Sequence, residues 1–143
     1  MLKTRRNIWQ SVDADCIVVP TNGSINDKSQ NLVQDEYLLK RYPGIENILG
    51  GYIRRYGNNA HVLTPLSFFK EKFDIVSFPI KECYNSNIDI ELVKTSAKQL
   101  IILAKKHKKW INVYIQGFGD NKINKVLGYI LKDNTFTLVY KEK

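Results

Sequence analysis

The chain has 143 residues, of which 43% are hydrophobic and 25% are charged. These fractions are typical of a folded soluble protein and argue against intrinsic disorder, and the length suits one domain that spans residues 1–143. The longest unbroken apolar run covers only residues 100–104, which is far too short to span a bilayer, so we expect no membrane association. The first ten residues lack the apolar segment of a signal peptide, so we expect a cytoplasmic protein.

The two cysteines, Cys16 and Cys83, are too few for a disulfide scaffold or a four-cysteine zinc site. We therefore expect reduced thiols, no metal and no cofactor. The formal net charge of +8 favours anionic partners, but it does not distinguish nucleic acid from phosphates or acidic surfaces. The densest basic run, residues 105–109, ends a predicted helix, where the helix dipole favours cations without any nucleic acid.

Strand and helix patterns alternate along the chain, which predicts an α/β protein rather than a helical bundle or a barrel. Residues 16–19 form a continuous apolar run rich in β-branched side chains, typical of an interior strand covered on both faces. Apolar residues from 45 to 56 recur with helical spacing, and Gly57 stands where such a helix ends. Ser86 followed by Asp89 predicts a capping box that opens a helix. In chain order, the predicted elements are a strand within residues 2–10, a strand at 15–21, helices at 31–40 and 45–56, strands at 61–65 and 73–78, a helix at 87–106, a strand at 111–116, a helix at 123–131 and a strand at 136–140.

Three predicted strands are followed by loops of the kind that contact ligands in open α/β sheets. The first is residues 20–23, Pro-Thr-Asn-Gly, and the second is residues 117–120, Gly-Phe-Gly-Asp. Glycines in such loops let backbone N–H groups approach a phosphate, although the same pattern also makes a plain tight turn. The third loop carries Lys81. A lysine that a fold removes from water can act as a nucleophile or a proton acceptor, although most lysines are solvated surface charges.

The order of these stretches resembles the macrodomain family. Residues 15–22, Asp-Cys-Ile-Val-Val-Pro-Thr-Asn, resemble the D-a-I-V-n-x-x-N strand of macrodomains. Residues 77–81, Ser-Phe-Pro-Ile-Lys, and residues 86–92, Ser-Asn-Ile-Asp-Ile-Glu-Leu, resemble the F-P-T-K and S-x-L-x-x-I segments of the antitoxin-type DNA ADP-ribosyl glycohydrolase-like branch. Residues 115–119, Ile-Gln-Gly-Phe-Gly, match the late P-x-x-G-x-G loop. All these segments stand in family order.

The resemblance implies a three-layer α/β/α sandwich around a central mixed sheet of about six strands. It also implies a cleft for ADP-ribose or a related nucleotide metabolite. Antitoxin-type macrodomains remove ADP-ribose from nucleic acid, and their relatives act on ADP-ribosylated acidic side chains. An ADP-ribosylated protein or nucleic acid is therefore an implied partner, and we expect the protein itself to be a monomer.

The resemblance assigns roles to particular residues. Lys81 matches the catalytic lysine that points at the distal ribose, and Asp120 is the nearest candidate for the carboxylate that a related branch carries in its late glycine loop. Asn22 is expected against the distal ribose and Phe118 on a ribose, while backbone N–H groups of residues 117–120 wrap the pyrophosphate. The residues expected to bind the ligand are Asn7, Ile8, Thr21, Asn22, Gly23, Asn31, Gly117, Phe118 and Gly119.

Several positions depart from the family pattern. The early glycine-rich loop, Gly-x-Gly-Ile-Ala in this branch, is Ser-Gln-Asn-Leu-Val at residues 29–33, and asparagine adds bulk where the backbone must approach a phosphate. The aspartate that recognises adenine is replaced by Asn7, whose amide is still able to accept from the adenine amino group. Tyr84 replaces a tryptophan, and Val19 replaces an asparagine.

Alternative functions therefore stay open. In the first, the protein binds ADP-ribose or a related metabolite and hydrolyses ADP-ribose from a modified target, with Lys81 and Asp120 as catalytic residues. In the second, it is a catalytically inactive, divergent macrodomain that serves as a binding module for another nucleotide, a protein or nucleic acid. A third alternative is nucleic-acid binding without an ADP-ribose site, although no groove-reading motif is present. Its basic residues would be Arg5, Arg6, Arg54, Arg55 and residues 105–109.

Overall fold

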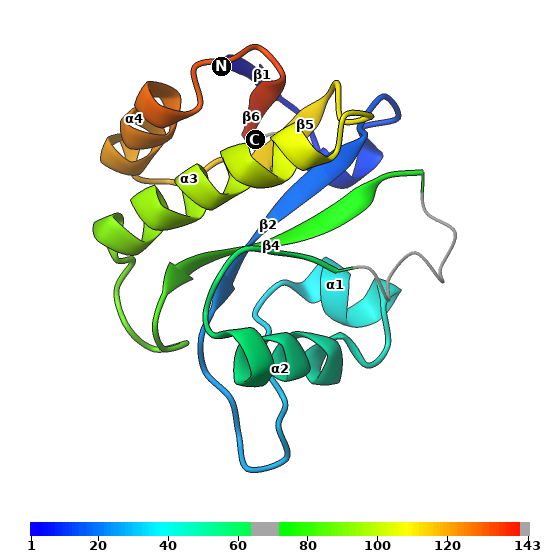
Figure 1. Ribbon diagram of the computed structural model, residues 1–143, viewed down its shortest axis with the longest axis vertical. Helices are drawn as coiled ribbons and strands as arrows, with labels where there is room; N and C mark the ends of the chain where they lie inside the picture. Colours follow the sequence, from blue (N-terminus) through cyan, green and yellow to red (C-terminus); the bar gives the residue numbers. More distant parts are fainter. Residues whose placement is uncertain (64–71, 141–143) are drawn as a thin grey trace.

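The computed structural model describes residues 1–63 and 72–140, which form a six-stranded mixed sheet with helices on both faces (Figure 1). The strand order is β1-β6-β5-β2-β4-β3, and each neighbouring pair is parallel except β3 with β4. The predicted α/β fold with a central mixed sheet is thereby confirmed. In chain order the elements are β1 (Leu2–Arg5), the 3-10 helix η1 (Ile8–Gln10), β2 (Cys16–Asn22), α1 (Glu36–Arg41), α2 (Ile45–Tyr56), β3 (His61–Val62), β4 (Asp74–Lys81), α3 (Ile90–Lys106), β5 (Val113–Gln116), α4 (Asn121–Ile130) and β6 (Phe136–Tyr140).

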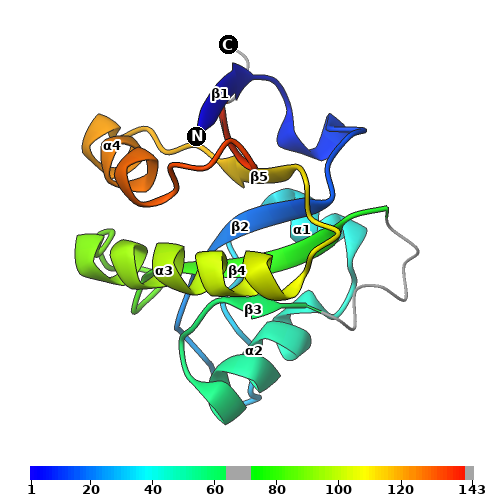
Figure 2. The same ribbon diagram turned by 45° about the horizontal axis from the view of Figure 1, so that its top comes forward.

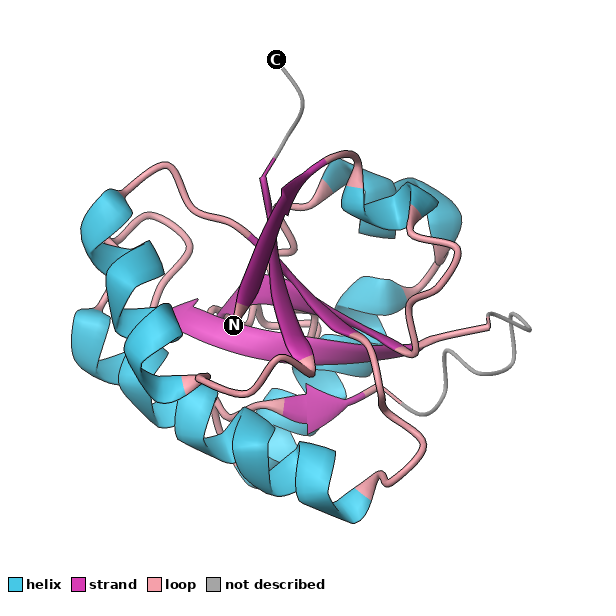
Figure 3. Ribbon diagram, turned by 90° about the horizontal axis from the view of Figure 1, so that it is seen from above, coloured by secondary structure: helices cyan, strands magenta, loops and turns pink. Residues whose placement is uncertain are grey.

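Helices lie on both faces of the sheet (Figure 2, Figure 3). The buried apolar side chains form two cores. Helices α3 and α4 contribute to one core, and α1 and α2 contribute to the other. Cys16 and Val18 of β2 enter the first core, whereas Ile17 and Val19 enter the second. Successive side chains of a strand point to opposite faces, so a strand between two helical layers needs apolar residues at every position.

Helix α2 forms where the sequence predicts it, because the spacing of its apolar residues and the glycine that follows them indicate the same helix. Ile45 and Leu49 are buried, whereas Arg54 and Arg55 are exposed in its last turn, as the amphipathic spacing predicts. Gly57 follows the helix with φ of 84°, a conformation that glycine adopts without strain.

The predicted helix at residues 31–40 begins later in the structure, at Glu36. The Asp35 carboxylate caps this helix, and Asn31 pairs with Ile25 in an isolated antiparallel bridge instead of entering it. The first half of the predicted helix is therefore extended chain that crosses α2, and the prediction was wrong for that half.

The predicted helix at residues 87–106 begins at Ile90. The Asp89 carboxylate accepts from two backbone N–H groups of the first turn and so serves as its cap, a position that the capping-box prediction gave to Ser86. The Ser86 hydroxyl instead donates to the Cys83 carbonyl at 2.8 Å, which closes a turn before the helix.

Smaller differences between prediction and structure concern the ends of other strands and helices. β4 extends to Lys81, beyond the predicted end at residue 78, and α4 begins at Asn121 instead of residue 123 because Asp120 caps it. β5 begins two residues later than predicted, at Val113. The strand predicted at residues 61–65 is confirmed for His61–Val62, and its last two residues lie outside the described part of the chain.

The parallel strands β1, β6, β5, β2 and β4 all end at the same edge of the sheet. Ligands of open α/β sheets bind at this carboxyl edge, because loops from neighbouring strands converge there. Of the helices in the described residues, none is both long and apolar enough to cross a membrane.

Candidate functional site

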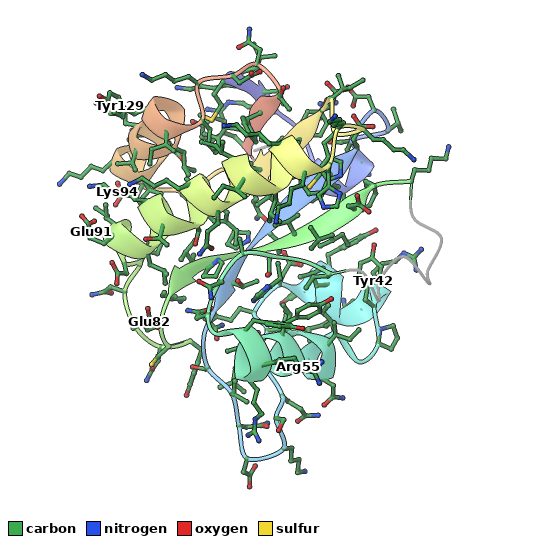
Figure 4. All side chains as sticks on the ribbon, in the orientation of Figure 1. Tyr42, Arg55, Glu82, Glu91, Lys94 and Tyr129 are labelled. Carbon is green, nitrogen blue, oxygen red and sulfur yellow. The ribbon has the colours of Figure 1, made fainter. Side chains whose placement is uncertain are left out.

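A cleft of about 900 Å³ lies where the parallel strands end, and its volume is within the range of small-molecule sites. Thr21 from β2, Lys81 from β4, Gln116 from β5 and Val139 from β6 all line it. Figure 4 labels Glu82, which directly follows Lys81 at the end of β4. The remaining lining residues are 6–9, Pro20, 34–37, Ile80 and Ile88.

The structure brings several of the predicted site residues together in this cleft. Asn7 and Ile8 follow β1, while Thr21 and Lys81 stand on neighbouring strands, so three distant segments of the sequence meet. Since the sheet order places β1 and β4 four strands apart, Asn7 and Lys81 mark opposite ends of the cleft. The other predicted residues do not line it: Asn22, Gly23, Asn31, Gly117, Phe118, Gly119 and Asp120.

Lys81 is held at the mouth of the cleft by the segment that follows its own strand. Its Nζ donates to the Tyr84 carbonyl at 3.0 Å, and the Gln34 Nε2 donates to the same oxygen at 3.2 Å. The Tyr84 N–H donates to the Ser24 hydroxyl at 2.9 Å. Both backbone groups of Tyr84 are thus engaged, and they connect Lys81 to Gln34 and Ser24. Gln34 could not be identified from the sequence, because no pattern links it to Lys81.

Asn22 and Asn31 hold the early loop, defined as residues 23–35, to the end of β2. The Asn22 Nδ2 donates to the Leu32 carbonyl, and its Oδ1 accepts from the Ser24 N–H, each at 2.9 Å. The Asn31 Nδ2 donates to the carbonyls of Asn22 and Ser24, also at 2.9 Å. Both side chains are buried. Their amides therefore stabilise the loop, and their role in ligand binding stays a prediction.

Gly23 lies where the early loop crosses the end of β4. Its N–H donates to the Lys81 carbonyl at 3.2 Å and to the Glu82 carbonyl at 3.1 Å. A Cβ at this position would lie 2.7 Å from the Glu82 carbonyl oxygen and 2.7 Å from the Asn58 Nδ2. The glycine therefore lets two backbone segments approach closely beside the cleft.

The late loop, residues 117–120, is held by hydrogen bonds to β6 and α4. The Gly117 N–H donates to the Val139 carbonyl at 2.7 Å. The Asn124 side chain accepts from the Phe118 N–H at 3.0 Å and donates to the Phe118 carbonyl at 2.8 Å. These two N–H groups of the loop are therefore already paired within the protein.

Gly119 and Asp120 form the exposed part of the late loop. The Asp120 carboxylate accepts from the Lys122 N–H at 2.8 Å and caps α4. The backbone N–H groups of Gly119 and Asp120 have no hydrogen-bond partner within residues 1–63 and 72–140. They are the N–H groups of this loop that a ligand can reach.

A pair of stacked aromatic side chains, Trp9 and Tyr37, lines the cleft near η1. The Trp9 ring stacks on the Tyr37 ring, with 4.3 Å between centroids and 14° between planes, and both residues line the cleft. Phe73 lies against Trp9 at 6.3 Å. This aromatic pair could not be identified from the sequence, because Trp9 and Tyr37 come from separate elements and no periodic pattern connects them.

The same arrangement of strands and helices occurs in solved structures. The macrodomain of Thermus aquaticus DarG superposes with a TM-score of 0.70 at 14% identity, covering 99% of this chain and 97% of that one. The macrodomain of Mycobacterium tuberculosis DarG has a TM-score of 0.70 at 13% identity, covering 96% and 94%. Thermosipho africanus DarTG in complex with ADP-ribose has a TM-score of 0.71 at 11% identity, covering 95% of this chain but 40% of that chain.

The chain has the macrodomain fold. No protein-family model and no curated protein sequence matches the chain, so the likeness is one of structure. The fold resemblance drawn from short sequence motifs is thereby confirmed, and two of these neighbours are DarG macrodomains.

Arg6 lines the macrodomain cleft beside Asn7 and contacts two groups beneath it. Its guanidinium carbon lies 4.7 Å from the centroid of the Tyr114 ring, and its Nη2 lies 3.8 Å from the Asp13 Oδ1. The Tyr114 hydroxyl donates to the Asp13 Oδ2 at 2.5 Å. This hydrogen bond is the main reason that the pKa of Asp13 is lowered, and the charge of Arg6 adds to it. Burial raises the pKa of Tyr114.

We expect Tyr114→Phe to destabilise the protein at neutral pH and to lose this effect in acid. The lowered pKa of Asp13 stabilises the fold fully above the ordinary value of 3.8, and that contribution disappears as the pH falls through the lower folded-state value. Urea unfolding of wild type and variant between neutral pH and about pH 2.5 measures the difference, which must shrink below 3.8. Tyr129→Phe is the control, because Tyr129 is 76% exposed on α4 (Figure 4). A difference that does not change with pH would contradict the expectation.

The described residues contain no group of three or more His, Cys, Asp or Glu side chains that is arranged to hold a metal ion. Cys16 is buried in β2, and burial raises the pKa of its thiol well above the ordinary value, whereas Cys83 is exposed. Both cysteines are free. The residues that line the cleft offer amides, aromatic rings, the Thr21 hydroxyl and four charged side chains, the cations Arg6 and Lys81 and the carboxylates Asp35 and Glu36.

Proposed function

We propose that the cleft binds ADP-ribose or a closely related nucleotide. The observation that carries this proposal is the position of the cleft, which follows the carboxyl ends of β1, β6, β5, β2 and β4 and joins Asn7 at one end to Lys81 at the other. One structural neighbour, Thermosipho africanus DarTG, is in complex with ADP-ribose. A nucleoside diphosphate sugar is long and has polar ends, which suits a cleft that crosses several strands.

The charges and donors around the cleft support an anionic ligand. Arg6 and Lys81 are cations at its two ends, and the carboxylates of Asp35 and Glu36 also line it, so the anionic groups of a ligand would lie toward the two cations. The backbone N–H groups of Gly119 and Asp120, shortly after Gln116 in the chain, have no partner among the described residues but lie outside the cleft lining. Backbone N–H groups that lack partners bind phosphate oxygens well. The net charge of +8 adds a long-range attraction for anions, which speeds their association.

We extend the proposal to hydrolysis of ADP-ribose from a modified protein or nucleic acid. Lys81 is the residue that would act near the distal ribose, because it lines the cleft and its Nζ donates to a backbone carbonyl at the cleft mouth. Its ammonium can place a proton or a charge where the bond to the leaving group breaks. The proposed proton-transfer role of Asp120 requires the late loop to bring this carboxylate closer, since it caps α4 and does not line the cleft.

The second candidate function is a catalytically inactive binding module. Several of the predicted ligand contacts are already used within the protein, which leaves fewer for a ligand: the Asn22 amide, the Asn31 Nδ2 and the N–H groups of Gly117 and Phe118. The early loop also carries Ser29 with φ of 61° at a position where the backbone favours glycine. Such a site would bind a nucleotide without processing it.

Isothermal titration of ADP-ribose, with AMP and NAD as comparators, tests the proposal. We expect ADP-ribose to bind with micromolar affinity or better. Thr21→Phe should abolish this binding, because a phenyl ring at the end of β2 fills the cleft. Thr95→Phe on the exposed side of α3 is the matched control and should bind as the wild type does. Absence of heat for all three nucleotides would contradict the proposed function.

A further inference from the structure

The positive charge of the protein is concentrated in residues 89–133, which include helices α3 and α4. This segment is less than a third of the chain, yet it holds nine lysines and only four acidic residues. Among the described residues, Lys94 is the one of these lysines that pairs with a carboxylate. The four acidic residues already have contacts within the protein: Asp89 and Asp120 cap the two helices, Glu91 pairs with Lys94, and Asp133 accepts from Thr135.

Helix dipoles explain only part of this charge. Lys105 and Lys106 lie in the last turn of α3, where the dipole favours cations. Lys122 lies in the first turn of α4, where the same dipole disfavours a cation, and Lys125 lies beyond that turn, where the dipole has little effect. The stability of α4 therefore does not account for these two lysines.

The two lysines share one exposed side of α4 with an aromatic ring. Lys122, Lys125 and Tyr129 are spaced by three and four residues, which places them on the same side of the helix, and all three are exposed. The Lys132 Nζ, just after the helix, lies 4.8 Å from the centroid of the Tyr129 ring. Tyr129 itself points away from the body of the molecule (Figure 4). We call these four residues the α4 stripe.

The α4 stripe ends at a hollow of about 280 Å³ between the last turns of α3 and α4. Lys132 and Lys105 line this hollow from the two helix ends, together with the Asp133 carboxylate and the apolar side chains of Trp110 and Phe136. The hollow lies where β6 begins, whereas the cleft lies where the parallel strands end, and the two share no lining residue. The α4 stripe is therefore a surface separate from the cleft.

We propose that the α4 stripe binds single-stranded nucleic acid. Lysines that follow one exposed line and lack carboxylate partners suit the regularly spaced phosphates of a strand, and such contacts supply most of the affinity of sequence-independent binding. The Tyr129 ring among them can stack a base that is not held in a duplex. An acidic protein segment would use the lysines but leave the ring without a partner. The inference does not depend on the proposed function, because no cleft residue takes part.

Fluorescence anisotropy of a labelled single-stranded DNA oligonucleotide of mixed sequence, at several salt concentrations, measures this binding. Lys122→Ala combined with Lys125→Ala should weaken binding by about tenfold or more at low salt and reduce the salt slope by about one per lysine. Lys28→Ala combined with Lys40→Ala is the matched control, because it removes the same charge from exposed positions outside the α4 stripe. This control should bind DNA as the wild type does.

Tyr129→Ala should weaken DNA binding by about tenfold and leave the salt slope unchanged, because stacking releases no counterions. Tyr129→Phe keeps the ring and should retain the affinity. Polyglutamate, an acidic peptide without bases, should bind more weakly than DNA and respond little to Tyr129→Ala. All these substitutions are at exposed positions, and unchanged melting temperatures verify the fold.

Thr21→Phe, which fills the cleft, separates the two sites. It should abolish ADP-ribose binding and leave DNA binding unchanged. Loss of DNA binding in Thr21→Phe would place the strand in the cleft and overturn this inference. Equal weakening by the two lysine pairs, polyglutamate that binds as tightly as DNA, or a wild type that binds no DNA at low salt would also overturn it. None of these outcomes bears on ADP-ribose binding, which the titration tests by itself.

Discussion

Gly50→Ala is expected to lower the free energy of unfolding by about 1–3 kcal/mol. Gly50 lies in α2, where the early loop passes directly over the helix. A Cβ at this position would stand 2.0 Å from the Ser29 carbonyl oxygen and 3.0 Å from the Asn31 nitrogen. Both contacts are with backbone, so no side chain can rotate away and the loop itself must move.

The early loop, which this substitution displaces, contributes residues to the lining of the cleft. The Asn31 N–H donates to the Glu46 carbonyl of α2 at 2.9 Å, and the Asn31 side chain connects the loop to the end of β2. Moving the loop strains these hydrogen bonds, and it also shifts Gln34, which lines the cleft and contacts the Tyr84 carbonyl. We therefore expect Gly50→Ala to weaken ADP-ribose binding together with stability.

Gly51→Ala is the matched control one residue further along the same helix. A Cβ at Gly51 has nothing within 4 Å, so the substitution removes only the helix-breaking tendency of glycine. We expect it to stabilise the protein by about 0.5–1 kcal/mol. Urea unfolding of the two variants and the wild type, at one temperature, measures both effects. Equal stability of Gly50→Ala and Gly51→Ala would show that the loop does not pack on α2 as described.

Lys81→Ala is expected to reduce de-ADP-ribosylation by about 100-fold, the lower range for loss of a proton-transferring side chain. Lys81 is the cation at the β4 end of the cleft, and its Nζ contacts only a backbone carbonyl, Tyr84, among the hydrogen bonds of the described residues. An interaction made in the transition state alone affects turnover and leaves ground-state binding in place. Titration of ADP-ribose into the variant should therefore still show binding.

Matched variants separate the roles of the two proposed catalytic residues. Lys98→Ala removes an exposed lysine from α3 and should leave the rate unchanged. Asp120→Asn keeps the cap of α4, because asparagine caps as well as aspartate, and it removes only the charge. Release of ADP-ribose from a modified substrate, followed by chromatography, measures all of them. Full activity of Lys81→Ala would contradict its catalytic role, and full activity of Asp120→Asn would contradict that of Asp120.

Elements whose features are local could be predicted from the sequence. The period of α2, the apolar run of β2 and the turn residues that follow it all express interactions within a few residues of each other. The starts of α1 and α3 could not be predicted, because each helix begins at the side chain that caps it in the folded structure. Asp35 and Asp89 do so, and Ser86 instead closes a turn with Cys83.

Some features of the candidate site could likewise be predicted from the sequence, and others could not. The order of motifs was enough to point to the macrodomain fold and to place Asn7, Ile8, Thr21 and Lys81 in one cleft, because parallel strands end at a common edge. The sequence could not show which loop residues turn inward. Asn31 was predicted to begin a helix and to bind the ligand, yet it is 1% exposed and its Nδ2 donates to backbone carbonyls of the protein.

By itself, therefore, the sequence determined the layered architecture and the edge of the sheet where a ligand would lie, since both follow from patterns of apolar residues and turns. Only the tertiary structure decided which polar groups face that ligand. The stacking of Trp9 on Tyr37 and the two donors that converge on the Tyr84 carbonyl join segments far apart in the chain. Such contacts depend on how whole elements pack, and no local pattern encodes them.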